Sequence, residues 1–222
     1  MSEFLHGNLS PWGYIIDSNS LPDFINTTEF SNFTAGKFGT DVRIATNIPS
    51  ATASIRNYCG WHISPNLTCG MLYRVQDLRD AFIGPDLLIQ LPATFVTSIE
   101  KVVLDAVLNP ETGLYEGEVK EDFDLGMGNG NVRIYDVGAR DRKSNIFIKY
   151  TAGFPDSEIQ VIKELTAHRV THAVTSSYGV MSEAAGGVSV SYNAVWAGNT
   201  RSTALPDDNK EVLEAYKVKG VF

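Results

Sequence analysis

The hydrophobic period changes twice along this chain, and this change constrains the fold more than any other feature of the sequence. Over residues 48–59, and again over about 156–177, apolar side chains recur with the 3.6-residue period of an amphipathic helix. Over residues 61–150 the pattern is short runs rich in β-branched and aromatic residues, separated by turns. The order predicts an α+β protein: a small helical bundle interrupted by an antiparallel β-rich lobe, with extended N- and C-terminal arms.

Residues that typically start or end helices set the limits of the predicted helices. Asn47 is placed to cap the helix over 48–59, Pro49 falls in its first turn, and Gly60 ends it. A shorter helical turn is expected over 27–33. The C-terminal part holds a last helix, from about Asp207 to Lys217.

The central region carries the strand signals. Five runs are expected as strands: 87–92, 99–108, 115–123, 132–137 and 146–151. The Gly- and Asn-containing segments 109–113 and 126–131 supply the positive φ values of tight turns and are expected to join antiparallel neighbours. For residues 74–81 both a short helix and an irregular loop remain open.

These signals divide the chain into four predicted parts. They are an N-terminal arm (1–26), a helical core (27–62 and 151–178), an inserted β-rich lobe (63–150), and a C-terminal docking arm with a short helix (179–222). The N-terminal arm lacks a steady period and is expected to need a partner surface.

Composition narrows the class of protein. The 222 residues have 43% hydrophobic and 20% charged side chains, enough apolar material for one ordinary core, and a net charge of −8. That charge disfavours a general phosphate-binding surface. Neither a signal peptide nor a membrane span is expected, so Cys59 and Cys69 are expected to be free thiols.

No catalytic or metal-binding pattern stands out. His168 and His172 have the spacing of two zinc ligands, but Arg169 occupies the position where the HExxH pattern needs glutamate. The glycines over 126–130 are followed by a predicted strand rather than a helix, so a phosphate loop is not expected there. We therefore expect no enzyme activity, no cofactor and no metal site.

Four stretches together resemble the head-tail connector, or adaptor, proteins of long-tailed bacteriophages. They are Ala53–Ile63, Ile148–Pro155, Glu183–Tyr192 and Leu213–Tyr216. The chain departs from the usual pattern of that family over residues 1–26, 69–82 and 193–205.

The resemblance implies a non-enzymatic virion protein of the neck, present in the host cytoplasm during assembly. Such a subunit forms a homo-oligomeric ring, commonly a dodecamer, between the portal protein and a tail-side neck, stopper or terminator protein. DNA would pass through the lumen without specific binding, and no membrane is involved. Two other readings remain open: another neck or tail-completion ring, and a small enzyme or sugar-binding β module.

Two sets of contact residues follow from the connector hypothesis. Lateral contacts between subunits are expected on the long helix, at Glu164, His168 and Arg169. Docking to the portal is expected at Val188, Val190, Tyr192, Val212, Leu213 and Tyr216. The alternating run 188–192 is typical of a strand added to a partner's sheet edge, but it could equally pair within its own subunit.

Overall fold

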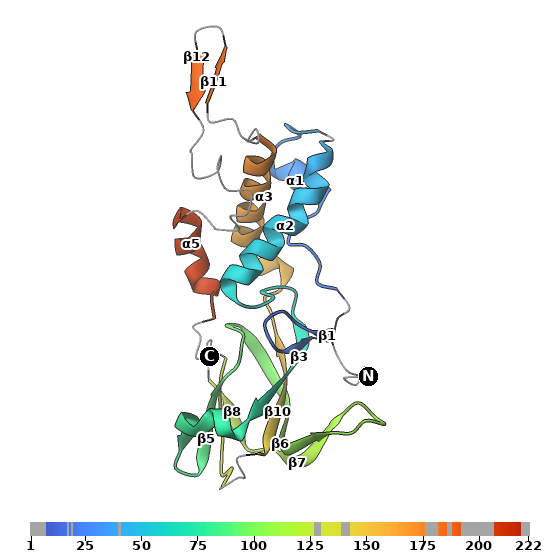
Figure 1. Cartoon of the computed structure of the whole chain (residues 1–222), viewed down its shortest axis with the longest axis vertical. Coiled ribbons are helices and arrows are strands. Elements are labelled where there is room, and N and C mark those ends of the chain that lie inside the picture. Colours follow the sequence, from blue (N-terminus) through green and yellow to red (C-terminus); the bar gives the residue numbers. More distant parts are fainter. Residues whose placement is uncertain are drawn as a thin grey trace. The chain divides into compact units, whose positions relative to one another are not determined.

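The protein has an α+β fold with helices and antiparallel sheets (Figure 1). The structure, a computed structural model, describes residues 8–16, 18, 20–39, 41–126, 130–138, 143–175, 182–185, 188–191 and 207–218. The chain divides into two compact units. We call Met1–Pro22, Cys59–Glu158 and Tyr216–Phe222 the sheet unit, and Asp23–Tyr58 with Ile159–Ala215 the helical unit.

A six-stranded antiparallel sheet forms the main part of the sheet unit, in the order β1-β2-β3-β10-β6-β7. Its strands are β1 (Asn8–Leu9), β2 (Ile15–Ile16), β3 (Leu67–Arg74), β6 (Val96–Leu108), β7 (Tyr115–Lys120) and β10 (Asn145–Ala152). The central strand β10 pairs along its whole length with β3, from Asn145 opposite Arg74 to Ala152 opposite Leu67. On its other side β10 pairs with β6.

A four-stranded antiparallel sheet completes this unit, in the order β4-β5-β9-β8. Its strands are β4 (Phe82–Ile83), β5 (Asp86–Gln90), β8 (Phe123–Leu125) and β9 (Asn131–Ile134). Leu87 and Ile89 alternate with Leu88 and are buried, whereas Leu88 is exposed, as expected for strands with one covered face. Two short 3-10 helices, Val75–Ala81 and Asp156–Glu158, lie in the connections.

The two predicted connections do join antiparallel neighbours. The structure also assigns residues 74–81, for which a short helix and a loop both remained open. Residues 109–113 connect the paired strands β6 and β7, and the segment 126–130, of which 127–129 lie outside the described residues, falls between the end of β8 and its partner β9. Residues 75–81 form the first 3-10 helix. Strand β3 is missing from the predicted strands.

The helical unit contains α1 (Thr27–Phe33), α2 (Val42–Cys59), α3 (Gln160–Thr175) and α5 (Asp207–Leu213). Helix α5 continues into a 3-10 turn (Glu214–Tyr216). The last residue of α2 and the last residue of this turn belong to the sheet unit. A hairpin of β11 (Ser182–Ala185) and β12 (Val188–Ser191) belongs to the helical unit. Buried side chains of α1, α2 and α3, together with Ile25 just before α1, form one cluster: Ile25, Phe30, Ile44, Ile48, Ala51, Ala167, Val170 and Val174. The three helices thus share a core, as the helical periods predicted.

The predicted start of α2 at residue 48 is wrong, because the helix begins at Val42. The Asp41 side chain accepts a hydrogen bond from the backbone N–H of Arg43 at 2.9 Å, as a capping residue does. Pro49 therefore lies inside the helix. Its missing N–H leaves the carbonyl of Ala45 without a helical donor, and both residues are exposed, so water can satisfy that carbonyl.

Part of the predicted N-terminal arm is built into the sheet. Residues 8–16 form the β1–β2 hairpin, and Ile15 and Ile16 pair with Gly70 and Cys69 of β3. Tyr14 and Ile16 are buried. The first seven residues lie outside the described part of the chain.

Candidate functional site: the aromatic junction and the predicted contact residues

An aromatic cluster in the sheet unit joins segments that are far apart in the sequence. We call Trp61, Phe154, Tyr216 and Phe95 the aromatic junction. The Phe154 ring stacks on Phe95 with centroids 4.4 Å apart, and it lies 5.9 Å from Trp61 and 5.4 Å from Tyr216. Such offset and edge-on contacts add stability beyond the apolar area that they bury.

Backbone hydrogen bonds fix the same segments. The Trp61 indole Nε1–H donates to the carbonyl oxygen of Tyr216 at 2.6 Å. The Phe154 N–H donates to the carbonyl of Ile63 at 2.7 Å, and the Val218 N–H donates to the carbonyl of Cys59 at 3.0 Å. The buried polar groups of the junction therefore have partners, as a structural core requires.

Gly153 lets the backbone turn into the junction. Its φ is +123°, which side-chain-bearing residues rarely adopt, and a Cβ there would overlap the carbonyl oxygen of Pro65. The glycine is thus required both for its conformation and for the close approach of the two backbones.

His62 lies next to the junction and is fully buried. Its Nε2 is 3.0 Å from the carbonyl oxygen of Ala152, which can only accept, so Nε2 carries the proton. Its Nδ1 then accepts from the Tyr14 hydroxyl at 2.8 Å, and the same hydroxyl accepts from the His62 backbone N–H at 3.0 Å. Both ring nitrogens have hydrogen-bond partners inside the core, so this histidine serves as a packing residue.

Three of the four stretches behind the connector resemblance meet at this junction. Trp61 belongs to the first stretch, Phe154 to the second and Tyr216 to the last. The third stretch contributes β12 and part of β11 to a separate hairpin in the helical unit. Trp61, Phe154 and Tyr216 therefore serve to pack the sheet unit.

The predicted lateral-contact residues lie on α3 with different exposures. Glu164 and His168 are exposed, and Glu164 accepts a hydrogen bond from Gln160 at 3.1 Å. Arg169 is half-buried, and burial lowers its pKa. His172, one turn beyond His168, has its pKa lowered by burial and by the neighbouring His168.

The predicted portal-docking residues that the structure describes belong to three different elements. Val188 and Val190 lie in β12, whose pairing with β11 shows that this run has a partner strand within its own chain. Leu213 is fully buried, whereas Val212 is 41% exposed. Tyr216 belongs to the aromatic junction, and Tyr192 lies outside the described residues.

The described residues hold no group of three or more His, Cys, Asp or Glu side chains arranged to bind a metal ion. None of the helices described combines the length and the apolar character needed to cross a bilayer.

Sequence reasoning missed the junction as a unit. The partners in its three ring contacts, Trp61–Phe154, Phe95–Phe154 and Phe154–Tyr216, lie 93, 59 and 62 residues apart in the sequence, so no local period or spacing could reveal it. The Trp-His pair and the Gly-Phe-Pro segment were visible as sequence features, but nothing local indicates that they touch.

No protein-family model matches the chain, and no curated protein matches it either.

Proposed function

We propose that this protein is a structural subunit of the head-tail connector ring of a long-tailed bacteriophage. In this role it would lie in the virion neck between the portal protein and a tail-side neck, stopper or terminator protein. Copies of the chain would extend the DNA channel between them.

The observation that carries this proposal is the meeting of Trp61, Phe154 and Tyr216 in the aromatic junction. These residues come from three of the stretches that resemble connector proteins. Their roles are packing and backbone hydrogen bonding, which are the roles expected where a family shares a scaffold rather than a reaction. The site thus favours a protein that acts through its surfaces.

Lateral contacts within the ring would use the exposed part of α3. Glu164 and His168 lie one helical turn apart on that surface and are accessible to a neighbouring subunit. A heterologous contact repeated from subunit to subunit forms a closed ring when a whole number of its rotations adds up to 360°. The family resemblance suggests twelve copies.

Charge supports passage of DNA rather than binding. Each copy carries a net charge of −8, and a ring repeats this charge in every subunit. An acidic lumen would repel phosphates and keep the affinity for the duplex low, so the genome could slide through.

Mass photometry of the purified full-length chain, alone and mixed with portal protein, tests the proposal. We expect ring-sized particles, and negative-stain images should show them seated on the portal. Monomer under both conditions at micromolar concentration would overturn it. Rings that do not bind the portal would favour another neck or tail-completion ring, and tight duplex binding by the ring at low salt would contradict the proposed channel.

A further inference from the structure

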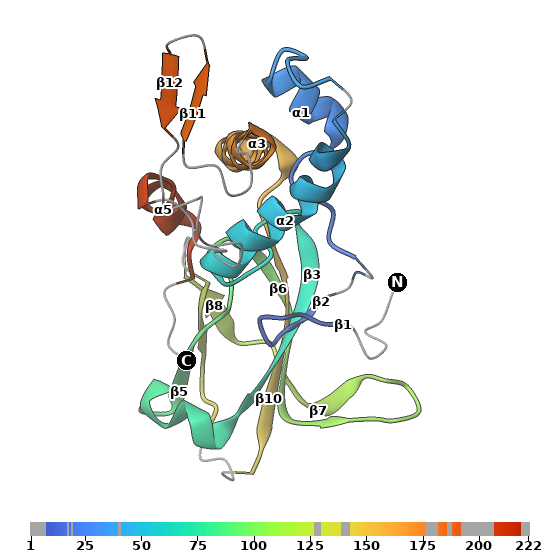
Figure 2. The same cartoon turned by 45° about the horizontal axis from the view of Figure 1, so that its top comes forward.

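Strand β7 forms an open edge of the six-stranded sheet. It pairs with β6 on one side and is the last strand in the sheet order, so no described strand covers its other side. Figure 2 shows the β6–β7 hairpin projecting past the neighbouring strands of this sheet. The outer backbone groups of an edge strand are a template for pairing with another chain.

The exposed part of β7 covers most of its length. Glu116, Gly117, Glu118 and Val119 are all exposed. Because side chains alternate along a strand, Glu116 and Glu118 lie on one face of the sheet, while Tyr115 and Val119 lie on the other. Tyr115 anchors the strand by stacking on Phe147 with centroids 4.3 Å apart.

Hydrogen bonds and close contacts within the hairpin hold β7 in its strand conformation without any partner. The Asn109 side chain accepts from the backbone N–H of Glu111 at 2.9 Å and donates to Glu116 at 2.8 Å. Next to the edge, β6 contains a bulge at which Asp105 has a φ of +53°. Gly117 fits against this bulge, because a Cβ there would overlap the carbonyl oxygen of Leu104. A preformed edge loses little conformational entropy when a strand is added.

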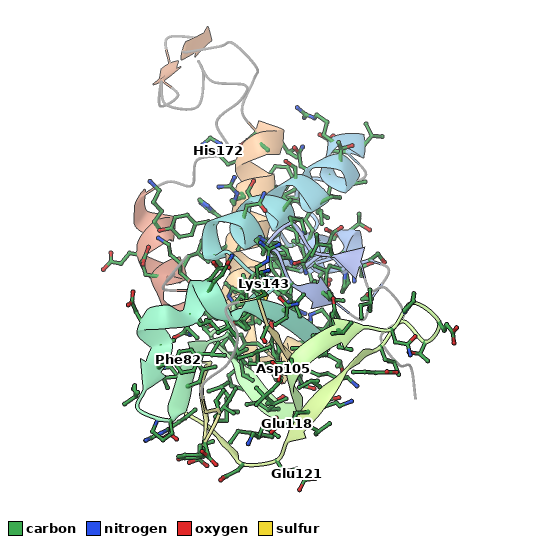
Figure 3. The ribbon with its side chains drawn as sticks, turned by 60° about the horizontal axis from the view of Figure 1, so that its bottom comes forward. Phe82, Asp105, Glu118, Glu121, Lys143 and His172 are labelled. Carbon is green, nitrogen blue, oxygen red and sulfur yellow. The ribbon has the colours of Figure 1, made fainter. Side chains whose placement is uncertain are left out.

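The charged residues in the segment that contains this edge are almost all acidic. Figure 3 labels three of the carboxylates: Asp105 in β6, Glu118 in β7 and Glu121 just after the end of β7. Between residues 105 and 124 the acidic residues are Asp105, Glu111, Glu116, Glu118, Glu121, Asp122 and Asp124. The same segment has one basic residue, Lys120, which is 3.3 Å from Glu118.

Charge on an edge strand also prevents unwanted pairing, and here it selects against particular partners. Like charges directly opposite each other across a strand pair are destabilising, so a second β7 or any acidic strand is repelled. Opposite charges at the same positions are stabilising. The edge thus excludes self-pairing while its backbone stays open to a basic strand.

We propose that β7 binds an extended basic segment of a partner protein as an added antiparallel strand. Lysine or arginine side chains at alternate positions of that segment would lie opposite Glu116 and Glu118. The backbone would supply affinity and the alternating charges specificity. This inference goes beyond the connector role, because the surface belongs to a single subunit and does not require a ring.

A short peptide of alternating threonine and lysine serves as the probe, with the full-length protein as its target. We expect the peptide to bind and to protect the amides of residues 116–119 from hydrogen exchange. A peptide of the same sequence and charge, but N-methylated at every residue, lacks the backbone donors on both edges. It should bind far more weakly and give no protection.

Two matched charge reversals locate the site on the protein. Glu116→Lys with Glu118→Lys changes the strand itself and should weaken binding about tenfold, because two favourable cross-strand pairs become unfavourable. Glu121→Lys with Asp122→Lys changes the net charge equally but lies beyond the end of β7, so it should weaken binding about twofold at most. Thermal unfolding of both variants checks that each is folded.

Three results would overturn the proposal. Equal weakening by the two charge reversals, or equal binding of the N-methylated peptide, would reduce the interaction to general electrostatic attraction. Concentration-dependent protection of residues 116–119 without peptide would show that a second copy occupies the edge. Ring formation is measured separately, so peptide binding without rings would contradict only the connector role, and rings without peptide binding only this inference.

Discussion

Tyr14 and His62 are joined by two hydrogen bonds through one phenol oxygen. The Tyr14 hydroxyl donates to His62 Nδ1 at 2.8 Å and accepts from the His62 backbone N–H at 3.0 Å. Both residues are buried. The N-terminal β1–β2 hairpin is therefore held to the rest of the sheet unit in two ways: by a polar contact inside the core and by its short pairing with β3.

Tyr14→Phe should lower the free energy of unfolding by about 1–3 kcal/mol, because it leaves two buried polar groups of His62 without their partner. Denaturant unfolding of both proteins measures the change. Tyr135→Phe is the matched control: its hydroxyl also donates a hydrogen bond, to Asp124, but in an exposed position. We expect the control to change stability by less than about 0.5 kcal/mol. Equal losses in both variants would contradict the special role of the Tyr14 contact.

The same contact shows why the N-terminal segment was hard to predict. Residues 8–16 contain Gly and Pro and no steady period, which is typical of an arm without a partner. Their order depends on Tyr14 and on a strand more than fifty residues away, which no local pattern reveals. Strand β3 was missed for a related reason. It has Gly70 at its centre, and its pairing with β10 rather than its own composition makes it a strand.

Features with local causes could be predicted. The helical periods identified α1, α2 and α3, and the turn residues identified the β6–β7 and β8–β9 connections. The predicted start of α2 was wrong because Asn47 and Pro49 are residue types typical of a helix start. In the structure Asp41 provides the capping hydrogen bond instead. In the structure the Asn47 side chain donates to the carbonyl of Arg43 within the helix.

Glu29 and Lys163 connect α1 to α3 within the helical unit at 2.9 Å, and the Lys163 side chain is 9% exposed. Glu29 also accepts from the backbone N–H of Asn26, completing a capping box. Glu29→Gln should therefore cost about 2–3 kcal/mol, because it leaves a buried ammonium without its counter-charge. Lys163→Met should cost less, since Glu29 is 34% exposed and keeps its capping role.

A double-mutant cycle on these two residues measures their coupling in the free energy of unfolding. The exposed pair of Arg43 and Asp41 provides a control, with an expected coupling of at most about 1 kcal/mol. A coupling for Glu29 and Lys163 no larger than this value would show that burial does not strengthen the pair.

Gly117→Ala should disrupt the β6–β7 hairpin, because the added methyl would overlap the Leu104 carbonyl oxygen and crowd a Val103 methyl at 2.9 Å. We expect a loss of about 2–3 kcal/mol or faster amide exchange over residues 115–120. A Cβ at Gly138 would meet no other atom, so Gly138→Ala should cost only the strain of an alanine at a φ of +69°, about 1–2 kcal/mol. This control should leave amide exchange in β7 unchanged. Unchanged exchange in β7 of Gly117→Ala would show that the bulge tolerates a side chain.

The pH dependence of stability should include a contribution from Glu100. Burial raises the pKa of Glu100, but hydrogen bonds from Lys149 at 2.9 Å and Thr151 at 2.7 Å outweigh burial and hold its pKa below the usual value. A carboxylate with a lowered pKa stabilises the folded state above its unfolded pKa, and this stabilisation is lost as the pH falls through the folded pKa.

Glu100→Gln should therefore be less stable than the wild type by about 0.5–1 kcal/mol at pH 7, a modest value because the Glu100 side chain is 34% exposed. The difference should shrink as the pH falls below about 4, where the unfolded carboxyl is protonated. Thermal unfolding of both proteins over this pH range is the measurement. A difference that stays constant with pH would assign the effect to packing rather than to charge.

The two cysteines should be unreactive until the protein unfolds. Both are free thiols with fully buried side chains, Cys59 at the end of α2 and Cys69 in β3 opposite Tyr150. Burial, with a smaller effect of the Glu100 charge, raises the pKa of Cys69 to about 12, so the nucleophilic thiolate is scarce at neutral pH. We expect Ellman's reagent to label neither thiol in the native protein at pH 8 and both in denaturant under non-reducing conditions. Rapid native labelling would show that the sheet around Cys69 opens easily, and absence of labelling in denaturant would reveal a disulfide.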